Sequence, residues 1–126
     1  MKLVGIDIAK YEHAAFIMEA STGESLCDPF FFKNNKEGFK KLYTELNKYS
    51  KNELLIGMED TGHYNFAIES SLLAEGYKVA LINPITTKSL RKASLKSVKS
   101  DKEDALLITK ALLDKAYYRI ISIQDE

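Results

Sequence analysis

The chain has 126 residues, is 45% hydrophobic and 29% charged, and carries a formal net charge of zero, so nothing in its overall charge favours a nucleic-acid partner. No stretch approaches the roughly 18 consecutive apolar residues of a membrane-spanning helix, and the single cysteine, Cys27, excludes an internal disulfide. We therefore expect one globular domain over residues 1–126, cytoplasmic and without membrane contact.

The first third of the chain predicts three strands, each short, apolar and bounded by polar residues: Leu3–Ala9, Glu12–Glu19 and Glu24–Lys33. The residues "STGE" (21–24) contain Gly23 and are typical of a hairpin turn between the second strand and the third. Pro29 removes a backbone donor from the third strand, so we expect that strand to lie at a sheet edge or to contain a bulge.

Beyond residue 34 the pattern alternates between helices and strands. Asn34 and Asn35 offer an N-cap to a helix that ends near residue 49, and Gly76 is typical of the residue after a helix. The elements predicted next are a strand at Glu53–Met58, a helix at His63–Glu75, a strand at Lys78–Ile82, a part-helical segment at Ile85–Ser100 and a helix from Asp101 to about Tyr117. This order predicts an α/β fold whose mixed sheet begins antiparallel, continues parallel and is covered by helices.

Two of these strands end on acids. In "LLIGMEDTGHY" (54–64) an apolar run finishes on Glu59 and Asp60, and the first strand finishes near Asp7. Because strand side chains alternate, Asp7 shares a face with Gly5, and Glu59 shares a face with Gly57, which leaves room around each acid. Each acid is either a polar strand terminus or part of a cation site, since an unpaired buried carboxylate is costly. Asp60 lies on the opposite face and is expected to be a turn or capping residue.

Two more acids stand at the start of the last helix. The residues "SDKE" (100–103) fit a capping box, so the helix should begin at Asp101. Asp101 and Asp104 lie three residues apart, on the face that continues through Ala105 and Ile108 and should pack against the sheet. The alternative is that first-turn acids only complement the helix dipole, which explains Glu103 better than the other two.

Four carboxylates gathered in one place would raise one another's pKa values unless cations neutralised them. Mg²⁺ prefers oxygen ligands and often shares them with substrate phosphates, and two such ions about 3.5–4 Å apart can assist phosphoryl transfer. We therefore predict a site for two Mg²⁺ or Mn²⁺ ions at the C-terminal ends of the first and fourth strands, held by Asp7, Glu59, Asp101 and Asp104.

The segment Thr86–Lys99 is basic and contains no acid. Cations beside acidic metal ligands suit a phosphodiester substrate, whose phosphates they neutralise. The alternative is a solvated connector, and a lone histidine such as His63 is more often a surface residue than a catalyst. The predicted nucleic-acid contacts come from Lys88, Arg91, Lys92, Lys96 and Lys99.

Three stretches, "GIDIAK" (5–10), "MEDTGHY" (58–64) and "KSDKEDA" (99–105), resemble the three motifs of the DEDD transposases of bacterial insertion sequences. The resemblance spans nearly the whole chain in the right order. Residues Thr61, Gly62 and Tyr64 match those that follow the family's glutamate, and Lys99 matches the lysine before its third acid. The family's acidic tetrad falls on Asp7, Glu59, Asp101 and Asp104, whereas Asp60 replaces a small residue.

The resemblance implies an RNase H-like, RuvC-like domain with a five-stranded sheet, its first three strands antiparallel, and helices on both faces. It also implies DNA cleavage and rejoining with DNA as substrate, a structured guide RNA and a homo-oligomeric full-length protein. Family members carry a second, C-terminal domain with a nucleophilic serine, so we interpret the chain as the N-terminal catalytic part of a longer transposase.

Other functions remain open at this point. A Holliday-junction-resolvase-like nuclease is closest in fold and chemistry. An ATPase of the sugar-kinase and actin type would need a second Gly-rich phosphate loop, which the six scattered glycines do not supply. A 3′–5′ exonuclease normally has Asp-x-Glu in its first strand, where this chain has Asp7-Ile8-Ala9. A non-catalytic nucleic-acid-binding module is the last alternative, because a fold alone does not establish chemistry.

Overall fold

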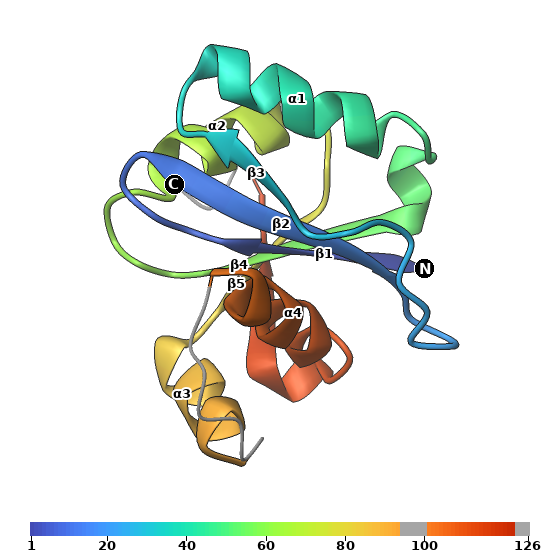
Figure 1. Ribbon diagram of the computed structural model, residues 1–126, viewed down its shortest axis with the longest axis vertical. Helices are drawn as coiled ribbons and strands as arrows, with labels where there is room; N and C mark the ends of the chain where they lie inside the picture. The colour runs from blue at the N-terminus through green and yellow to red at the C-terminus, as the bar shows by residue number, and fades with distance from the viewer. Residues whose placement is uncertain (94–100, 123–126) are drawn as a thin grey trace.

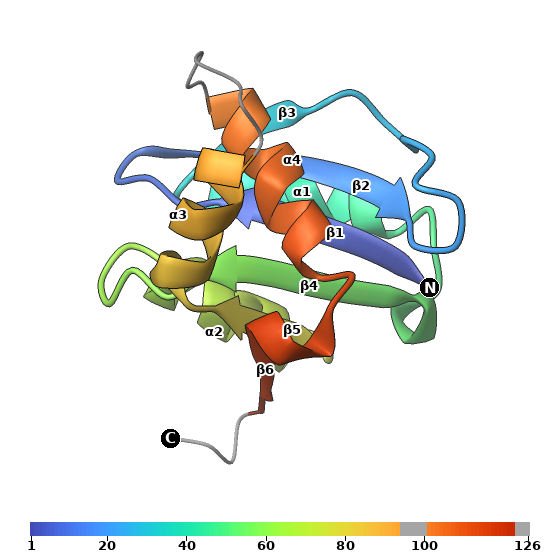
Figure 2. The ribbon, with the colours of Figure 1, turned by 90° about the horizontal axis from the view of Figure 1, so that it is seen from below.

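The structure is a computed structural model that describes residues 1–93 and 101–122, without the side chains of residues 101 and 102. Within these residues one sheet has the strand order β3-β2-β1-β4-β5-β6, and helices cover both of its faces (Figures 1 and 2). The strands are β1 (Lys2–Asp7), β2 (Glu12–Glu19), β3 (Phe30–Lys33), β4 (Leu54–Glu59), β5 (Val79–Ile82) and β6 (Tyr118–Ile121). The helices are α1 (Lys36–Leu46), α2 (Phe66–Ala74), α3 (Pro84–Ala93) and α4 (Asp101–Ala111), with short 3₁₀ turns at Lys51–Glu53 and Lys115–Tyr117.

The sheet is mixed, as the order of elements predicts. Strands β1, β2 and β3 pair antiparallel, and β4 then joins β1, and β5 joins β4, in parallel. Each parallel step requires a crossover, which α1 supplies before β4 and α2 supplies before β5. The sheet therefore has the antiparallel start and parallel continuation expected from sequence, and its parallel strands end at one shared edge.

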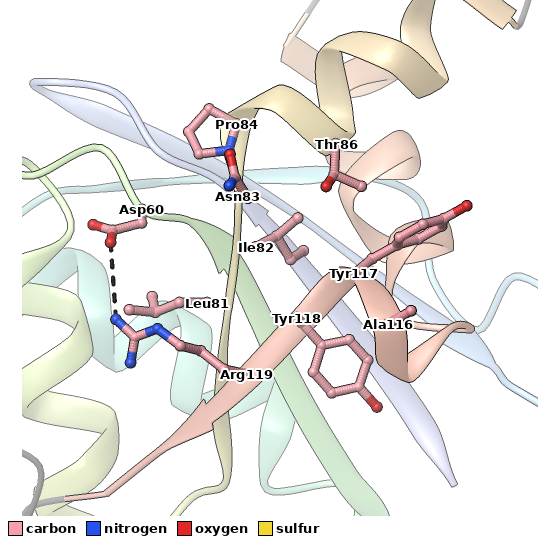
Figure 3. A pocket seen from close by; sticks show the side chains of 10 residues that line it. All are labelled: Asp60, Leu81, Ile82, Asn83, Pro84, Thr86, Ala116, Tyr117, Tyr118 and Arg119. Carbon is pink, nitrogen blue, oxygen red and sulfur yellow. Dashed lines mark ion pairs between the residues drawn. The ribbon is translucent and has the colours of Figure 1, made fainter.

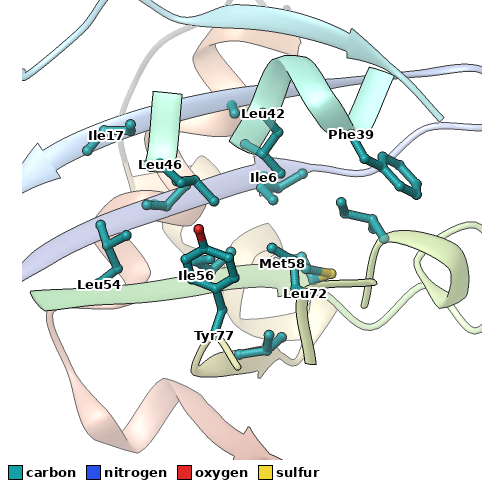
Figure 4. Close-up of a cluster of buried hydrophobic side chains, with 14 of the residues drawn as sticks. Ile6, Ile17, Phe39, Leu42, Leu46, Leu54, Ile56, Met58, Leu72 and Tyr77 are labelled. Carbon is teal, nitrogen blue, oxygen red and sulfur yellow. The ribbon is translucent and has the colours of Figure 1, made fainter. Parts of the chain in front are cut away.

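The two faces of the sheet have separate apolar cores. Helices α1 and α2 cover one face, where Leu42, Leu46 and Leu72 pack on Ile6 and Ile56 (Figure 4). Helix α4 covers the other face, which confirms that helices lie on both faces. No helix in the described residues is long and apolar enough to cross a membrane.

Several helix boundaries follow local rules. Asn35 caps α1, since its side-chain oxygen accepts a hydrogen bond from the Gly38 backbone N–H at 2.8 Å. Gly76 follows α2 with a φ of 87°, a left-handed conformation that glycine adopts at least cost. Helix α2 begins at Phe66 rather than at His63, because Gly62, with a φ of 83°, and the turn after it lie before the helix.

The third strand is shorter than predicted. It begins at Phe30 rather than at Glu24, and Ser25 makes only an isolated bridge to Met18. Pro29 stands directly before the first strand residue, where its missing N–H costs no ladder bond. The prediction of an edge strand was correct, and the prediction of its length was wrong.

The last predicted helix is also too long, and a sixth strand was missed. Helix α4 ends at Ala111, after which the Asp114 carboxylate accepts a hydrogen bond from the Ala116 N–H and starts a 3₁₀ turn. The chain then enters β6, which pairs antiparallel with β5. The sheet thus has six strands within the described residues rather than the five predicted.

Two glycines let α4 lie unusually close to the sheet. A Cβ atom on Gly5 would stand 2.1 Å from Thr109 Oγ1, 2.5 Å from the Thr109 backbone N and 2.7 Å from the Ala105 carbonyl oxygen. A Cβ atom on Gly57 would stand 2.4 Å from Leu112 Cδ2. The room that the sequence suggested around the acids is therefore filled by α4 itself.

We expect Gly5→Ala to destabilise the fold more than Gly57→Ala does. The added methyl group at Gly5 meets helix backbone, which cannot rotate away, so the free energy of unfolding should fall by about 2–3 kcal/mol or more. The three atoms nearest to the methyl group at Gly57 all belong to the Leu112 side chain, which can rotate away. Truncating Thr109 removes the Oγ1 contact but leaves both backbone contacts at Gly5. Denaturant titration should therefore find a larger favourable coupling between Gly57→Ala and Leu112→Ala than between Gly5→Ala and Thr109→Ala. Equal coupling in both pairs would contradict the backbone contact.

Candidate active site

Asp7 and Glu59 lie side by side at the edge where the parallel strands end. The register of β1 against β4 pairs Gly5 with Gly57 and Ile6 with Met58, so the next residue along each strand is one of these acids. Neighbouring strands lie about 4.7–4.9 Å apart. Both acids are half-buried and belong to the face that α4 covers, as their alternation with the glycines predicts.

The first turn of α4 lies at the same edge. Ala105 packs over Gly5, two residues before Asp7, and Asp104 directly precedes Ala105. The Asp104 residue is only 8% exposed, and the helix face behind it, through Ala105 and Ile108, is buried against the sheet. This confirms the predicted orientation of the helix. Asp101 begins the helix, and its side chain lies outside the described part of the structure.

Helix α3 contacts two of the predicted acids. The Thr87 hydroxyl donates a hydrogen bond to Glu59 Oε1 at 2.9 Å. One helical turn further on, Arg91 donates from Nε at 3.1 Å and from Nη2 at 2.9 Å to Asp104 Oδ1. Residues four apart share a helix face, so a single face of α3 donates hydrogen bonds to an acid of β4 and an acid of α4. The structure thereby brings Glu59 and Asp104 to a common neighbour.

The structure describes three of the five basic residues predicted to contact nucleic acid. Arg91 pairs with Asp104 in this structure. Lys88 and Lys92 are exposed on the same helix. The nucleic-acid contacts of all three stay a prediction. Lys96 and Lys99 fall outside the described residues.

The donor chemistry of the acids suits a hard cation, because carboxylate oxygens are the ligands that Mg²⁺ prefers. Among the described side chains, no three acids, histidines or cysteines are arranged to hold a metal ion. The Asp101 side chain is not among them, so the convergence of the four acids stays a prediction. In this structure the Arg91 guanidinium supplies the positive charge beside Asp104.

Asp60 lies apart from these contacts, as predicted. Its carboxylate faces Arg119 of β6, with 4.0 Å between Oδ2 and Nη2. Burial, and then the nearby Asp60 charge, raise the pKa of Glu69 on α2. His63 and Tyr64, in the loop after Asp60, are exposed.

A buried histidine that the sequence reading passed over anchors the loops beside the acids. His13 on β2 has no exposed surface, and its Nδ1 accepts a hydrogen bond from the Ala9 N–H at 3.1 Å. Asn34 lies beside it and donates from Nδ2 to the carbonyl oxygens of Lys10, at 3.2 Å, and Tyr64, at 3.5 Å. The loops that follow Asp7 and Glu59 are thus joined through one amide. The signal available in the sequence was a histidine at an inward-facing strand position.

Comparisons with known proteins identify a matching family model and curated relatives. The family model of IS110-type DEDD proteins, described as Transposase, matches residues 4–126. The pilin gene-inverting proteins of Moraxella bovis and Moraxella lacunata are each 28% identical over 109 residues, which cover 85% of this chain and 33% of the relative. The chain therefore spans about a third of the length of these curated relatives.

Among solved structures, T. thermophilus RuvC in complex with Holliday junction substrate is similar in fold. The TM-score is 0.60, at 16% sequence identity, over 86% of this chain and 90% of the RuvC chain. At this identity the likeness concerns the fold alone. It confirms the predicted RuvC-like, RNase H-like α/β class.

The pairing of Arg91 with Asp104 should be measurable in stability. Arg91→Ala leaves a nearly buried carboxylate without this donor, so the free energy of unfolding should fall by about 1–3 kcal/mol. Lys92→Ala, at the exposed neighbouring position, should change it by less than about 0.5 kcal/mol. A double-mutant cycle between Arg91→Ala and Asp104→Ala, followed by denaturant titration, should give a clear coupling energy, and additive effects would argue against the pair.

Stability should also depend on the protonation of His13 below about pH 6.5. Burial lowers the pKa of His13 below its ordinary value of about 6.5, against a smaller opposing effect of Asn34. Folding therefore favours the neutral ring, so its contribution is complete above about pH 6.5 and declines as the pH falls below that value. His13→Asn, whose side-chain oxygen can replace Nδ1 as acceptor, should remove this decline.

The control for that experiment is His63→Asn, because His63 is exposed and is the other histidine of the chain. Thermal unfolding at several pH values should show the wild-type decline in His63→Asn and a flatter profile in His13→Asn. Identical profiles for the two variants would exclude His13 as the titrating group.

Proposed function

Because the chain belongs to the family of DEDD transposases, whose model matches residues 4–126, we propose that it forms the metal-dependent catalytic domain of a DNA transposase or recombinase. In this role it positions phosphodiesters for cleavage and strand transfer. The observation that carries the proposal is the β1–β4 register, which sets Asp7 beside Glu59 at the strand ends under the first turn of α4.

Asp7, Glu59, Asp101 and Asp104 would hold two Mg²⁺ or Mn²⁺ ions. When bound, such ions supply activation of the attacking oxygen and stabilisation of the leaving oxygen. The chain's own residues orient the acids. Thr87 fixes the rotamer of Glu59, and Arg91 balances the charge of Asp104. The exposed Lys88 and Lys92, with Lys96 and Lys99, would neutralise phosphates along the bound strand.

The relatives support DNA as the substrate. Two of them are named for inverting a pilin gene, and the RuvC structure holds a Holliday junction. Strand exchange through a branched DNA intermediate is consistent with both. A structured guide RNA and a homo-oligomeric full-length protein belong to the proposal through the family motifs alone.

The site is proposed to be completed by another part of the protein. The curated relatives are about three times as long as their match to this chain, and the family motifs imply a serine nucleophile in a second domain. The acids of this chain would then hold the phosphate that the serine attacks, and correct placement of that phosphate is worth several orders of magnitude in rate.

A Holliday-junction-resolvase-like nuclease is the second candidate, favoured by the fold likeness to RuvC over most of both chains. Such an enzyme needs no second domain, because the acids would activate water. The 126-residue chain alone would then cut a four-way junction in Mg²⁺. Under the transposase proposal the chain alone performs no strand exchange.

The experiment for metal dependence compares neighbouring acids. Mg²⁺ or Mn²⁺ should raise the melting temperature of the wild-type chain, because a ligand that binds only the folded state stabilises it. The rise should be smaller in Asp7→Asn and in Glu59→Gln. Asp60→Asn is the matched control, since Asp60 faces Arg119 rather than the acids, and it should keep the full rise.

Activity is tested in the full-length transposase with donor DNA and guide RNA. Glu59→Gln should abolish strand exchange, whereas Glu37→Gln, at an exposed acid in the first turn of α1, should retain it. Strand exchange by the 126-residue chain alone would overturn the composite site, and full exchange by Glu59→Gln would overturn the assignment of the acids.

A further inference from the structure

A pocket of about 430 Å³ opens beside the proposed catalytic edge. Its lining includes Asp60, the residue after Glu59, and Thr86, the residue before the threonine that bonds Glu59. The far wall comes from residues 116–119, at the start of β6 (Figure 3). The pocket is therefore adjacent to the predicted acids along two separate stretches of backbone.

The lining combines apolar surface with polar groups in a way that suits a flat, polar-edged ligand. Ile82 of β5 lies near the middle of the view, Leu81 lies on the left beside Arg119, and Tyr117 and Tyr118 stand on the right (Figure 3). Asn83 and Thr86 on the α3 side, and Asp60 and Arg119 on the other, add hydrogen-bonding groups. The volume falls within the roughly 300–1,000 Å³ of small-ligand sites.

The charges of the pocket favour a neutral ring attached to an anionic chain. Within the described residues, the acid of the lining, Asp60, faces the guanidinium of Arg119 at 4.0 Å, so the two charges offset each other. The Arg119 side chain is 66% exposed and can reach a phosphate outside the pocket. Nucleobases are neutral aromatic rings with donors and acceptors on their edges, and they stack on tyrosine.

We propose that this pocket takes an unpaired nucleobase of the DNA strand whose phosphate lies at the acids. The inference rests on the proposed function and adds a ligand to it. A paired base cannot enter a concave site without leaving its helix, so the pocket selects unstacked nucleotides next to the scissile phosphate. The ring would stack against Tyr117, and Asp60 and Asn83 would face its polar edge.

The test uses fluorescence of 2-aminopurine placed at single positions of a single-stranded oligonucleotide, titrated with the 126-residue chain in EDTA. Stacking on tyrosine should quench one position more than its neighbours. Tyr117→Ala should weaken binding of that oligonucleotide about five- to hundredfold, the range of one base–aromatic stack, whereas Tyr117→Phe should bind as the wild type does. Tyr64→Ala removes an exposed tyrosine outside the pocket and should change binding less than twofold.

Two further measurements distinguish a base within a DNA strand from a free nucleotide, and the pocket proposal from the proposed function of the acids. A free deoxynucleotide should compete only weakly, because it lacks the neighbouring phosphates; strong competition would assign the pocket to a free nucleotide and overturn the proposal. Equal binding by Tyr117→Ala and wild type, or equal losses in Tyr117→Ala and Tyr64→Ala, would also overturn it. These titrations contain no metal, so Asp7→Asn should quench the 2-aminopurine fluorescence as the wild type does. Failure of the pocket is therefore distinguishable from failure of the acids, because strand exchange by Glu59→Gln tests the acids separately.

Discussion

The close contact between α4 and the two central strands is the constraint on which the rest of the site depends. Helices normally pack on sheets through interlocking side chains, but at Gly5 the backbone of α4 itself meets the strand. This contact fixes how far α4 stands from the sheet and where along β1 its first turn falls. Asp104 stands one residue before Ala105, so its position beside the strand ends follows from a contact that does not involve its own carboxylate.

Helix α3 adds a second constraint, which concerns charge rather than shape. Thr87 and Arg91 project from one helix face toward acids on two different elements, so α3 ties the end of β4 to the start of α4. A carboxylate as enclosed as Asp104 needs a cation or several donors, and Arg91 meets that need in this structure. A metal ion at Asp104 would compete with the guanidinium for the same oxygen, and Arg91 would then be available to a phosphate.

Much of this arrangement could be predicted from the sequence, since it follows from short-range rules. Strand alternation places Asp7 and Glu59 on one face, and the helical repeat turns Asp104 toward the sheet. The meaning of the glycines could not be read in the same way, because a glycine leaves space equally for a ligand and for a helix. Only the three-dimensional packing decides which of them occupies it.

Other features depend on contacts between distant residues. The helical pattern continues through Leu112, and nothing in the sequence signals that the Asp114 carboxylate ends it by capping the next turn. Strand β6 is only four residues long, and its position is set by antiparallel pairing with β5. Arg91 belongs to a run of cations that looks uniform along the chain, and its pairing with Asp104 depends on how two helices meet.

The bonds of Asn34 have a consequence for how the site meets its substrate. One amide group spans the loop after β1 and the loop after β4, with the buried His13 beside it holding the first of these loops. The conformations of the two loops are therefore coupled. The conformational entropy of the two loops is thus lost when the chain folds rather than each time a substrate binds. Such preorganisation lowers the cost of binding and aligns the substrate with the site.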